Sequence, residues 1–277
     1  MSVKIFGTKN LGRKILIKIL YLLSILILIT LFVVLWEKYV TAHDIPKRIL
    51  PKPSDILEYA QKEFFTEHRR GYESLLAKSF NSFFDAIIGF LISAVLGTLI
   101  GITFAIYKFI KEGFSPVLFI IQLLPVPAFA PVIASMLGYG LSTKIFIIVL
   151  FTIFPFTVAA HDAVKNIPHY YKSLLETYNA DKIKTYIYLI LPAVIPNLLH
   201  TMRIAAPASI VASIIAELPL TVSNGIGKDI YTSFNNQIIP RVWLSLIIIS
   251  VISLLFFGAV SFLDEYINRK YKYGQFK

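Results

Sequence analysis

Long apolar runs constrain this chain more than any other feature of its sequence. The first run extends from Ile15 to Trp36 with Lys18 as its single charge, and comparable runs recur as far as Phe262. A helix of this length crosses the ~30 Å hydrocarbon core of a bilayer. With 56% hydrophobic residues and a mean hydropathy of +0.71, the chain holds more apolar surface than one soluble core can bury. The sequence therefore predicts an all-α integral membrane protein.

The runs predict about six transmembrane helices. They cover approximately residues 15–36, 82–107, 114–136, 144–160, 193–216 and 242–262. Residues 1–36 then form a cytoplasmic N-terminus with the first span, and residues 37–78 form an extracytoplasmic connector. The connector is either a solvated loop or a binding surface. Residues 79–277 form a core of five spans with a cytoplasmic tail at 269–277.

The distribution of charge orients these spans. The segments assigned to the inner side carry a clear excess of Lys and Arg, whereas acidic residues almost neutralise the long outer connector. Positive loops face the cytoplasm, so both termini are expected inside a plasma or inner membrane. Trp36 and Tyr39 then mark the outer interface. The net charge of +11 is explained by these flanks, because the basic residues lie between apolar runs and form no nucleic-acid-binding surface.

A polar stretch from Ser173 to Pro192 interrupts the apolar sequence and predicts two short helices joined by a turn. Asn179 tolerates the left-handed conformation that closes a helix, and Asp181 is a good N-cap for the next one. The orientation places this hairpin in the cytoplasm, between the fourth and fifth spans. Such an amphipathic hairpin can dock on a partner.

Several residues inside the spans are candidates for a translocation pathway. Pro125, Pro127 and Pro131 interrupt the third span, and the carbonyl groups that prolines free are tolerated only against protein or a water-filled cavity. A kinked helix without a transport role is the alternative. Arg203 lies about 11 residues from Pro192, ~17 Å into the bilayer, and either lines a pathway or packs and snorkels. Glu217 ends the fifth span.

The sequence lacks the residues that several other classes of function require. Gly89, Ser93, Gly97 and Gly101 recur at every fourth position of an apolar helix, which predicts close helix packing and not a phosphate-binding loop. The five histidines show no metal-ligand spacing, and the chain has no Cys, which removes disulfides and thiolate sites. We expect no catalytic residue, no metal and no cofactor. A secondary transporter or an intramembrane enzyme without an ATPase partner stays the alternative.

The segment from Val164 to Ile204 resembles the cytoplasmic loop of ATP-binding-cassette importer permeases, the binding-protein-dependent inner-membrane family of type I importers. The family motif runs Glu-Ala-Ala, three residues, Gly, nine residues, Ile-x-Leu-Pro. Leu191 and Pro192 match its end, Asn179 takes the Gly position, and Ser173, Leu174 and Leu175 replace Glu-Ala-Ala, with Glu176 displaced. The stretches ILPKPSDIL, LLPVPAFAPVIASMLGYG and AELPLTVSNGIGKDI resemble the nitrate, sulfonate and taurine branch of the family.

The resemblance implies a permease core with a coupling loop at 164–192, working as a dimer, expected to be a homodimer, with two cytoplasmic ATPase subunits and an extracytoplasmic binding protein. ATP and Mg would be bound by the ATPase, because this chain has no Gly-x-x-x-x-Gly-Lys-Ser/Thr loop. The residues expected to couple to the ATPase are Ser173, Leu174, Leu175, Glu176, Tyr178, Asn179, Ala180, Asp181, Lys182, Leu191 and Pro192. The branch carries small anions and also thiamine precursors, and Arg203 favours an anion.

Overall fold

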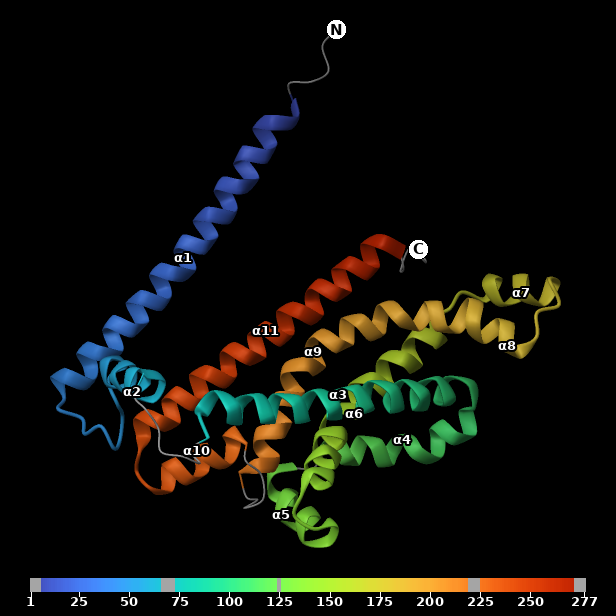
Figure 1. The fold of residues 1–277 in the computed structure, drawn as a ribbon. Coiled ribbons are helices and arrows are strands. Elements are labelled where there is room, and N and C mark those ends of the chain that lie inside the picture. The colour runs from blue at the N-terminus through green and yellow to red at the C-terminus, as the bar shows by residue number, and fades with distance from the viewer. Residues whose placement is uncertain (1–5, 66–72, 124–125, 219–224, 272–277) are drawn as a thin grey trace. The chain divides into compact units, whose positions relative to one another are not determined.

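Figure 1 shows the computed structural model of the chain, which describes residues 6–65, 73–123, 126–218 and 225–271. All regular structure in these residues is helical. The helices are α1 (Phe6–Ala42), α2 (Pro53–Phe65), α3 (Leu75–Ile106), α4 (Lys108–Leu123), α5 (Val126–Leu137), α6 (Leu141–Lys165), α7 (His169–Thr177), α8 (Lys182–Thr185), the π-helical turn η1 (Tyr186–Ile190), α9 (Leu191–Glu217), α10 (Ile226–Asn235) and α11 (Ile239–Tyr271).

Within the described residues, five helical stretches are long and apolar enough to cross a membrane. They are Ile19–Ala42, Leu75–Ile106, Leu141–Lys165, Lys182–Glu217 and Ile239–Lys270. These match five of the expected spans and confirm the all-α membrane fold. Most bounds are wider than expected, because the helices continue past the apolar runs through polar turns.

The expected third span, 114–136, corresponds to two helices in the described residues. It is divided between α4 and α5, which end and begin on either side of residues 124–125. Pro125 is at this boundary and lies outside the described residues. Pro127 and Pro131 both lie within α5, so these two prolines do not end that helix. Lys108 and Lys111, which lie between the expected spans 82–107 and 114–136, are in the first turn of α4.

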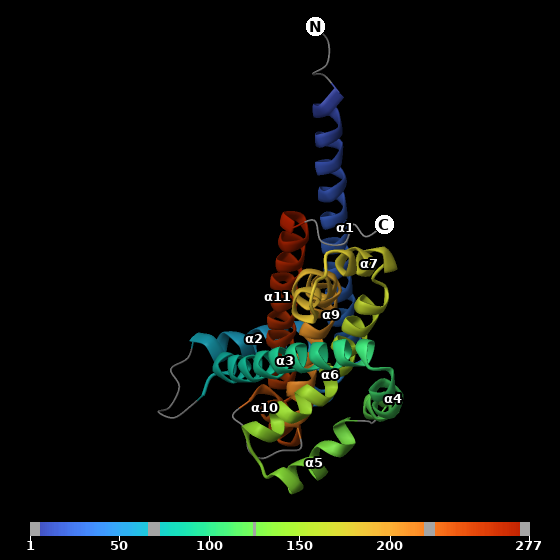
Figure 2. The ribbon, with the colours of Figure 1, turned by 90° about the vertical axis from the view of Figure 1, so that its right-hand side faces the viewer.

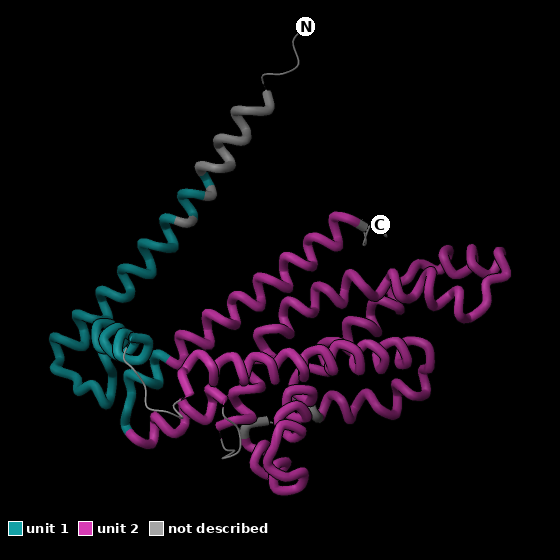
Figure 3. Tube along the Cα trace, viewed as in Figure 1, with its two compact units in different colours: residues 1–67, 237–244 teal, residues 68–236, 245–277 magenta. Residues whose placement is uncertain are grey.

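The chain divides into two compact units (Figure 3). The first unit comprises residues 1–67 and 237–244. In it, Glu37 of α1 accepts hydrogen bonds from the backbone N–H and the hydroxyl of Ser54, at 3.1 and 2.7 Å. Arg241 of α11 donates to the Tyr59 hydroxyl and pairs with Glu63 of α2, at 3.3 and 3.4 Å. These bonds attach α2 to both long helices of the unit.

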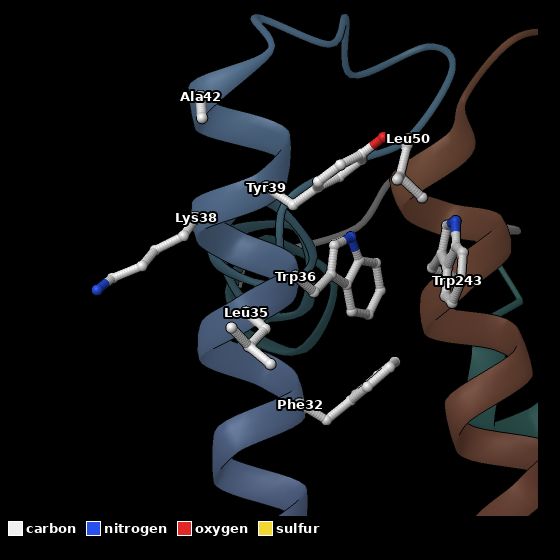
Figure 4. Close-up of a pocket in the computed structure, with 8 residues that line it drawn as sticks. All are labelled: Phe32, Leu35, Trp36, Lys38, Tyr39, Ala42, Leu50 and Trp243. Atoms are coloured by element: carbon white, nitrogen blue, oxygen red, sulfur yellow. The ribbon is translucent and has the colours of Figure 1, made fainter.

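The first unit also contains an apolar groove between α1 and the start of α11 (Figure 4). Its volume is about 770 Å³. The rings of Trp36 and Trp243 approach to 4.7 Å between centroids in this groove, and Phe32 and Tyr39 lie on the same side of α1. The Lys38 side chain extends away from the two indole rings. The aromatic residues predicted to mark a membrane interface therefore lie together.

The second unit comprises residues 68–236 and 245–277, and α3, α6 and α9 form its centre. The stripe of small residues on α3 faces α6, as expected. A Cβ atom at Gly97 would lie 2.7 Å from the Ile153 carbonyl oxygen, and Ser93 and Thr152 share a hydrogen bond of 2.6 Å. Close backbone approach of this kind requires residues without bulky side chains.

Buried apolar clusters hold the remaining helices of the second unit. Phe90 and Phe156 pack edge to face, with Val260 of α11 in the same cluster. Ala130 of α5 packs with Ile147 of α6. Figures 1 and 2 show that α7 and α8 lie at the end of α9 away from α10, so the second unit presents different structures at its two ends.

Candidate functional site

The hairpin between α6 and α9 forms as the sequence predicts. Helix α7 ends at Thr177, Asn179 adopts φ 50°, and α8 begins at Lys182. The Asp181 carboxylate accepts a hydrogen bond of 2.8 Å from the backbone N–H of Lys184, which is the N-cap geometry. The local residues determine this turn because Asn tolerates positive φ and Asp satisfies a free helix N–H.

One face of α7 is exposed and the other is packed. Leu174 is 51% exposed and Tyr178 is 77% exposed, although both are large apolar side chains. Leu175 and Tyr171, one helical turn apart, pack against the cluster of buried residues at the ends of α3 and α6. Leu175, expected to contact a partner, is therefore partly buried inside this chain and supports the hairpin from within.

The second arm of the hairpin is continuous with the long apolar helix α9. The expected boundary between the second arm of the hairpin and the fifth span is Pro192. In the structure, α8, η1 and α9 form one helical stretch across this position. Pro192 lacks an N–H and its ring excludes the carbonyl of the preceding turn, and the helix accommodates it by widening. The Leu191 N–H bonds to the Tyr186 carbonyl, five residues back, in a π-type turn.

The base of the hairpin is buried. Leu189 and Ile190 of η1 belong to one cluster with Ile102 of α3 and Val164 of α6. The base of the hairpin therefore packs against three long helices, α3, α6 and α9.

The remaining expected coupling residues are mostly polar and solvent-facing. The Ser173 hydroxyl lies 3.1 Å from the His169 ring, within α7. Glu176 and Lys182 are exposed, Ala180 is partly exposed, and Leu191 is 48% exposed. Of these residues, Glu176 and Lys182 carry charge.

A buried ionic network lies at the opposite end of α9. Glu217 is 0% exposed and forms an ion pair with Lys144 of α6, which also pairs with Asp85 of α3 at 2.5 Å. Ser82 of α3 donates to Glu217 at 2.7 Å, and the Gly227 N–H of α10 donates at 2.6 Å. Four helices therefore converge on one carboxylate.

Sequence reasoning missed Lys144, Asp85 and Ser82 as members of a site. Lys144 and Asp85 lie near the ends of the expected spans 144–160 and 82–107, where single charges are ordinary. The sequence feature that could have indicated this site is Lys144 at the start of one apolar run, together with the acidic residues Asp85 and Glu217 in two other runs. Their pairing depends on helix positions that sequence spacing does not provide.

The Arg203 side chain has two hydrogen-bonding partners within the chain. Its guanidinium donates to the Asp264 carboxylate at 3.0 Å and to the Ser261 hydroxyl at 3.1 Å, which joins α9 to α11. Asp264 is 3% exposed. The expectation of an anionic solute depended on a free positive charge at Arg203. Because Asp264 pairs with Arg203, that charge is neutralised within the chain.

The prolines of the third span are only partly described. Pro127 and Pro131 lie in α5, where Pro131 is exposed, and Pro125 is outside the described residues. Ala130 and Ala216, the chain neighbours of Pro131 and Glu217, belong to one buried cluster with Ile147, whereas Arg203 pairs with Asp264 of α11.

Comparison with known proteins agrees with this architecture. The family described as binding-protein-dependent transport system inner membrane component matches residues 93–273. The formylaminopyrimidine transport permease protein ThiX of Halalkalibacterium halodurans is 30% identical over 64% of this chain and 71% of its own length. The nitrate import permease protein NrtB of a Synechocystis species is 24% identical over 78% of this chain and 79% of its own length.

A further relative covers more of the chain, and a solved structure shares the fold. A probable ABC transporter permease protein of Haemophilus influenzae is 25% identical over 87% of this chain and 95% of its own length. An inward-facing structure of the MetNI methionine ABC transporter gives a TM-score of 0.60 at 14% identity, covering 71% of this chain and 95% of that one. The chain belongs to the family of binding-protein-dependent transport system inner membrane components, the permease subunits of ABC importers.

Proposed function

We propose that this chain works as a homodimer that forms the solute pathway of an ATP-driven importer, and that the hairpin within 164–192 couples the pathway to a separate cytoplasmic ATPase dimer. Both termini face the cytoplasm, and an extracytoplasmic binding protein delivers the solute. ATP and Mg are bound and consumed on the ATPase. The observation that carries the proposal is the hairpin, with its exposed apolar face and buried base.

The exposed face has the composition of a docking helix. Leu174 of α7 and Tyr178, the residue directly after α7, have exposed side chains, and the charged residues Glu176 and Lys182 nearby in the sequence are exposed as well. An amphipathic helix of this kind fits into a groove of a partner protein, where a few large side chains carry most of the binding energy. Tyr178 is the largest exposed side chain at the tip and is the expected anchor.

The buried base supports transmission of movement. ATP-driven closure of two ATPase subunits would bring two hairpins together, and rigid-body movement of packed elements is a common route for such a shift. Leu189 and Ile190 tie the hairpin to α3 and α6, while α9 continues from it through the membrane. The far end of α9 is Glu217, where the external helix α10 is attached.

The solute is proposed to be small. The relatives' names refer to formylaminopyrimidine, nitrate and bicarbonate, which include charged and uncharged compounds. The neutralised Arg203 does not favour the anions among them.

The coupling is tested with Tyr178→Asp in the assembled complex. A buried carboxylate in the groove should cost at least about 2 kcal/mol of ATPase binding, roughly thirtyfold in affinity. Co-purification of the ATPase and solute-dependent ATP hydrolysis should both fall. Tyr231→Asp is the matched control, because Tyr231 is 52% exposed on α10, away from the hairpin, and should leave ATPase co-purification unchanged. Normal co-purification and coupling in Tyr178→Asp would refute the role of the hairpin.

Orientation is tested separately with single cysteines, which is simple because the chain has none. Thr177→Cys on the hairpin and Gln61→Cys on α2 are both at exposed positions. A membrane-impermeant maleimide added outside intact cells should label Gln61→Cys alone, and labelling of Thr177→Cys under these conditions would contradict the proposed topology.

A further inference from the structure

The apolar groove of the first unit lies on a membrane-crossing helix that the rest of the described chain leaves largely uncovered (Figure 4). The most apolar window of α1 contains no buried residue. The groove has a volume of about 770 Å³, which is in the range of ligand sites. The indole rings of Trp36, from α1, and Trp243, from the start of α11, line it. In a bilayer, such a surface contacts either lipid or another protein.

The groove changes from apolar to polar along α1. Phe32, at one end, lies ~10 Å closer to the middle of the span than Tyr39, at 1.5 Å per residue. Figure 4 shows the Tyr39 hydroxyl beside Leu50, at the end of the groove near the last turn of α1. The indole nitrogen of Trp243 points toward the same end. A phospholipid has the same polarity, because its chains lie in the hydrocarbon core and its polar groups lie at the interface.

The attachment of α2 places the polar end of the groove at the level of the lipid headgroups. Helix α2 is bonded through Ser54 to Glu37 and through Glu63 to Arg241. These two partners lie within two residues of the two tryptophans along the chain, so α2 runs at the depth of the aromatic belt. A helix at this depth keeps its apolar side chains at the membrane boundary. The large apolar side chains that α2 exposes are Leu57, Phe64 and Phe65.

Two exposed cations lie near the polar end of the groove. The Lys38 side chain borders the groove, and Arg48 precedes Leu50 by two residues. Both are exposed, and neither forms an ion pair with another described residue. Cations at this level attract the phosphate of an anionic lipid. A second copy of the chain, related by a twofold axis along the membrane normal, would bring the same cations to the same level, where like charges repel.

We propose that this groove is a binding site for an anionic phospholipid of the leaflet in which α1 ends. One acyl chain lies against Phe32 and the two indole rings. The phosphate lies at the Leu50 end, where Lys38 and Arg48 attract it. This site requires only that α1 crosses a bilayer, so it does not depend on the proposed coupling to an ATPase.

The test uses the tryptophan fluorescence of the full chain in phosphatidylcholine nanodiscs. The chain has only two tryptophans and both line the groove, so the signal reports on this site alone. The probes are phosphatidylglycerol and phosphatidylcholine with brominated acyl chains, each added as a minor component, because bromine quenches an indole that it contacts. Half-maximal quenching should require at least about fivefold less brominated phosphatidylglycerol, the ratio expected from one basic residue. Equal quenching by the two lipids would overturn the proposal.

Charge variants test the contact with the headgroup. Lys38→Gln combined with Arg48→Gln should remove the preference for phosphatidylglycerol, so that the two lipids quench alike. Lys165→Gln combined with Lys182→Gln is the matched control, because it removes two exposed cations from the second unit and should retain the preference. All four side chains are exposed, so these variants should fold. A preference that survives the loss of Lys38 and Arg48 would contradict the assignment.

A second pair of variants locates the lipid in the groove. Leu50→Asp places a carboxylate on the groove wall, whereas Ile49→Asp places it on the preceding residue, which is 68% exposed and does not line the groove. Both add the same charge at neighbouring positions. Leu50→Asp should therefore weaken phosphatidylglycerol binding at least about fivefold more than Ile49→Asp, because only Leu50→Asp puts a charge against the acyl chain. Equal effects would refute the groove as the site.

The mass of the same nanodisc particles identifies a competing occupant. Particles that hold two chains, with tryptophans that neither brominated lipid quenches, would assign the groove to a second copy of the chain and overturn the inference. Particles that hold two chains and keep the preference for phosphatidylglycerol would support a lipid site that remains open in the dimer.

Discussion

Replacing Lys144 by Met should be among the most destabilising single changes in the second unit. Lys144 is 3% exposed and lies between the carboxylates of Glu217 and Asp85. Met has a similar length and no charge, so the substitution leaves two acidic groups close together without their shared cation. Removing one partner of a buried ion pair costs about 3–5 kcal/mol, since the remaining charge stays desolvated. We expect a loss of unfolding free energy in this range.

A second substitution shows whether electrostatics causes the loss. Glu217→Gln removes one of the two acidic charges, while a Gln carbonyl oxygen at the Oε2 position still accepts from the Ser82 hydroxyl and from the Gly227 N–H. Alone, Glu217→Gln leaves Lys144 paired with Asp85 and should cost less than Lys144→Met. In the double variant the two losses should fall short of their sum by more than about 1 kcal/mol, whereas independent sites add within about 0.5 kcal/mol.

The assay is reversible unfolding in detergent micelles, followed by circular dichroism of the helices. Lys165→Met is the matched control, because Lys165 is an exposed residue in the last turn of the same helix and should change stability by less than about 0.5 kcal/mol. If Lys144→Met is no worse than Lys165→Met, or if the double variant is additive, the reasoning from charge burial is wrong.

Three other perturbations test other parts of the fold. Asn179→Val should destabilise the hairpin by about 1–2 kcal/mol because φ is 50° at this position, and Asn179→Gly should not, as limited proteolysis of the loop would report. Gly97→Leu should lower the unfolding free energy by about 1–3 kcal/mol or prevent folding, while Gly258→Leu, which meets no atom within 4 Å, should be neutral in the same unfolding assay. Arg203→Gln and Asp264→Asn should each destabilise the chain, and their combination should recover stability in a double-mutant cycle, because neither buried charge is then left alone.

Features that depend on neighbouring residues were predictable from the sequence. The apolar runs located five membrane-crossing helices because the bilayer requires a minimum apolar length. Asn179 and Asp181 located the turn and cap of the hairpin because their effects act within a few residues. The four-residue spacing of the small residues on α3 indicated a packing face, and the structure confirms it.

Features that depend on distant residues were not predictable. Leu175 and Leu174 are adjacent and chemically identical, and only the position of α7 against the ends of α3 and α6 decides that Leu175 packs inward and Leu174 remains exposed. The third span looked continuous in hydropathy, which measures apolar length and does not show that two helices, α4 and α5, cover its described residues.

The sequence by itself determined the membrane class, the hairpin turn and the helix faces that pack, because each follows from apolar length, backbone preference or periodicity along the chain. Only the tertiary structure decided which charges are partners. Lys144 meets Glu217 and Asp85, and Arg203 meets Asp264, across three-dimensional contacts between helices far apart in the chain. A charge in an apolar span must find a partner, but the sequence does not specify which of several acids the packing of helices brings within reach.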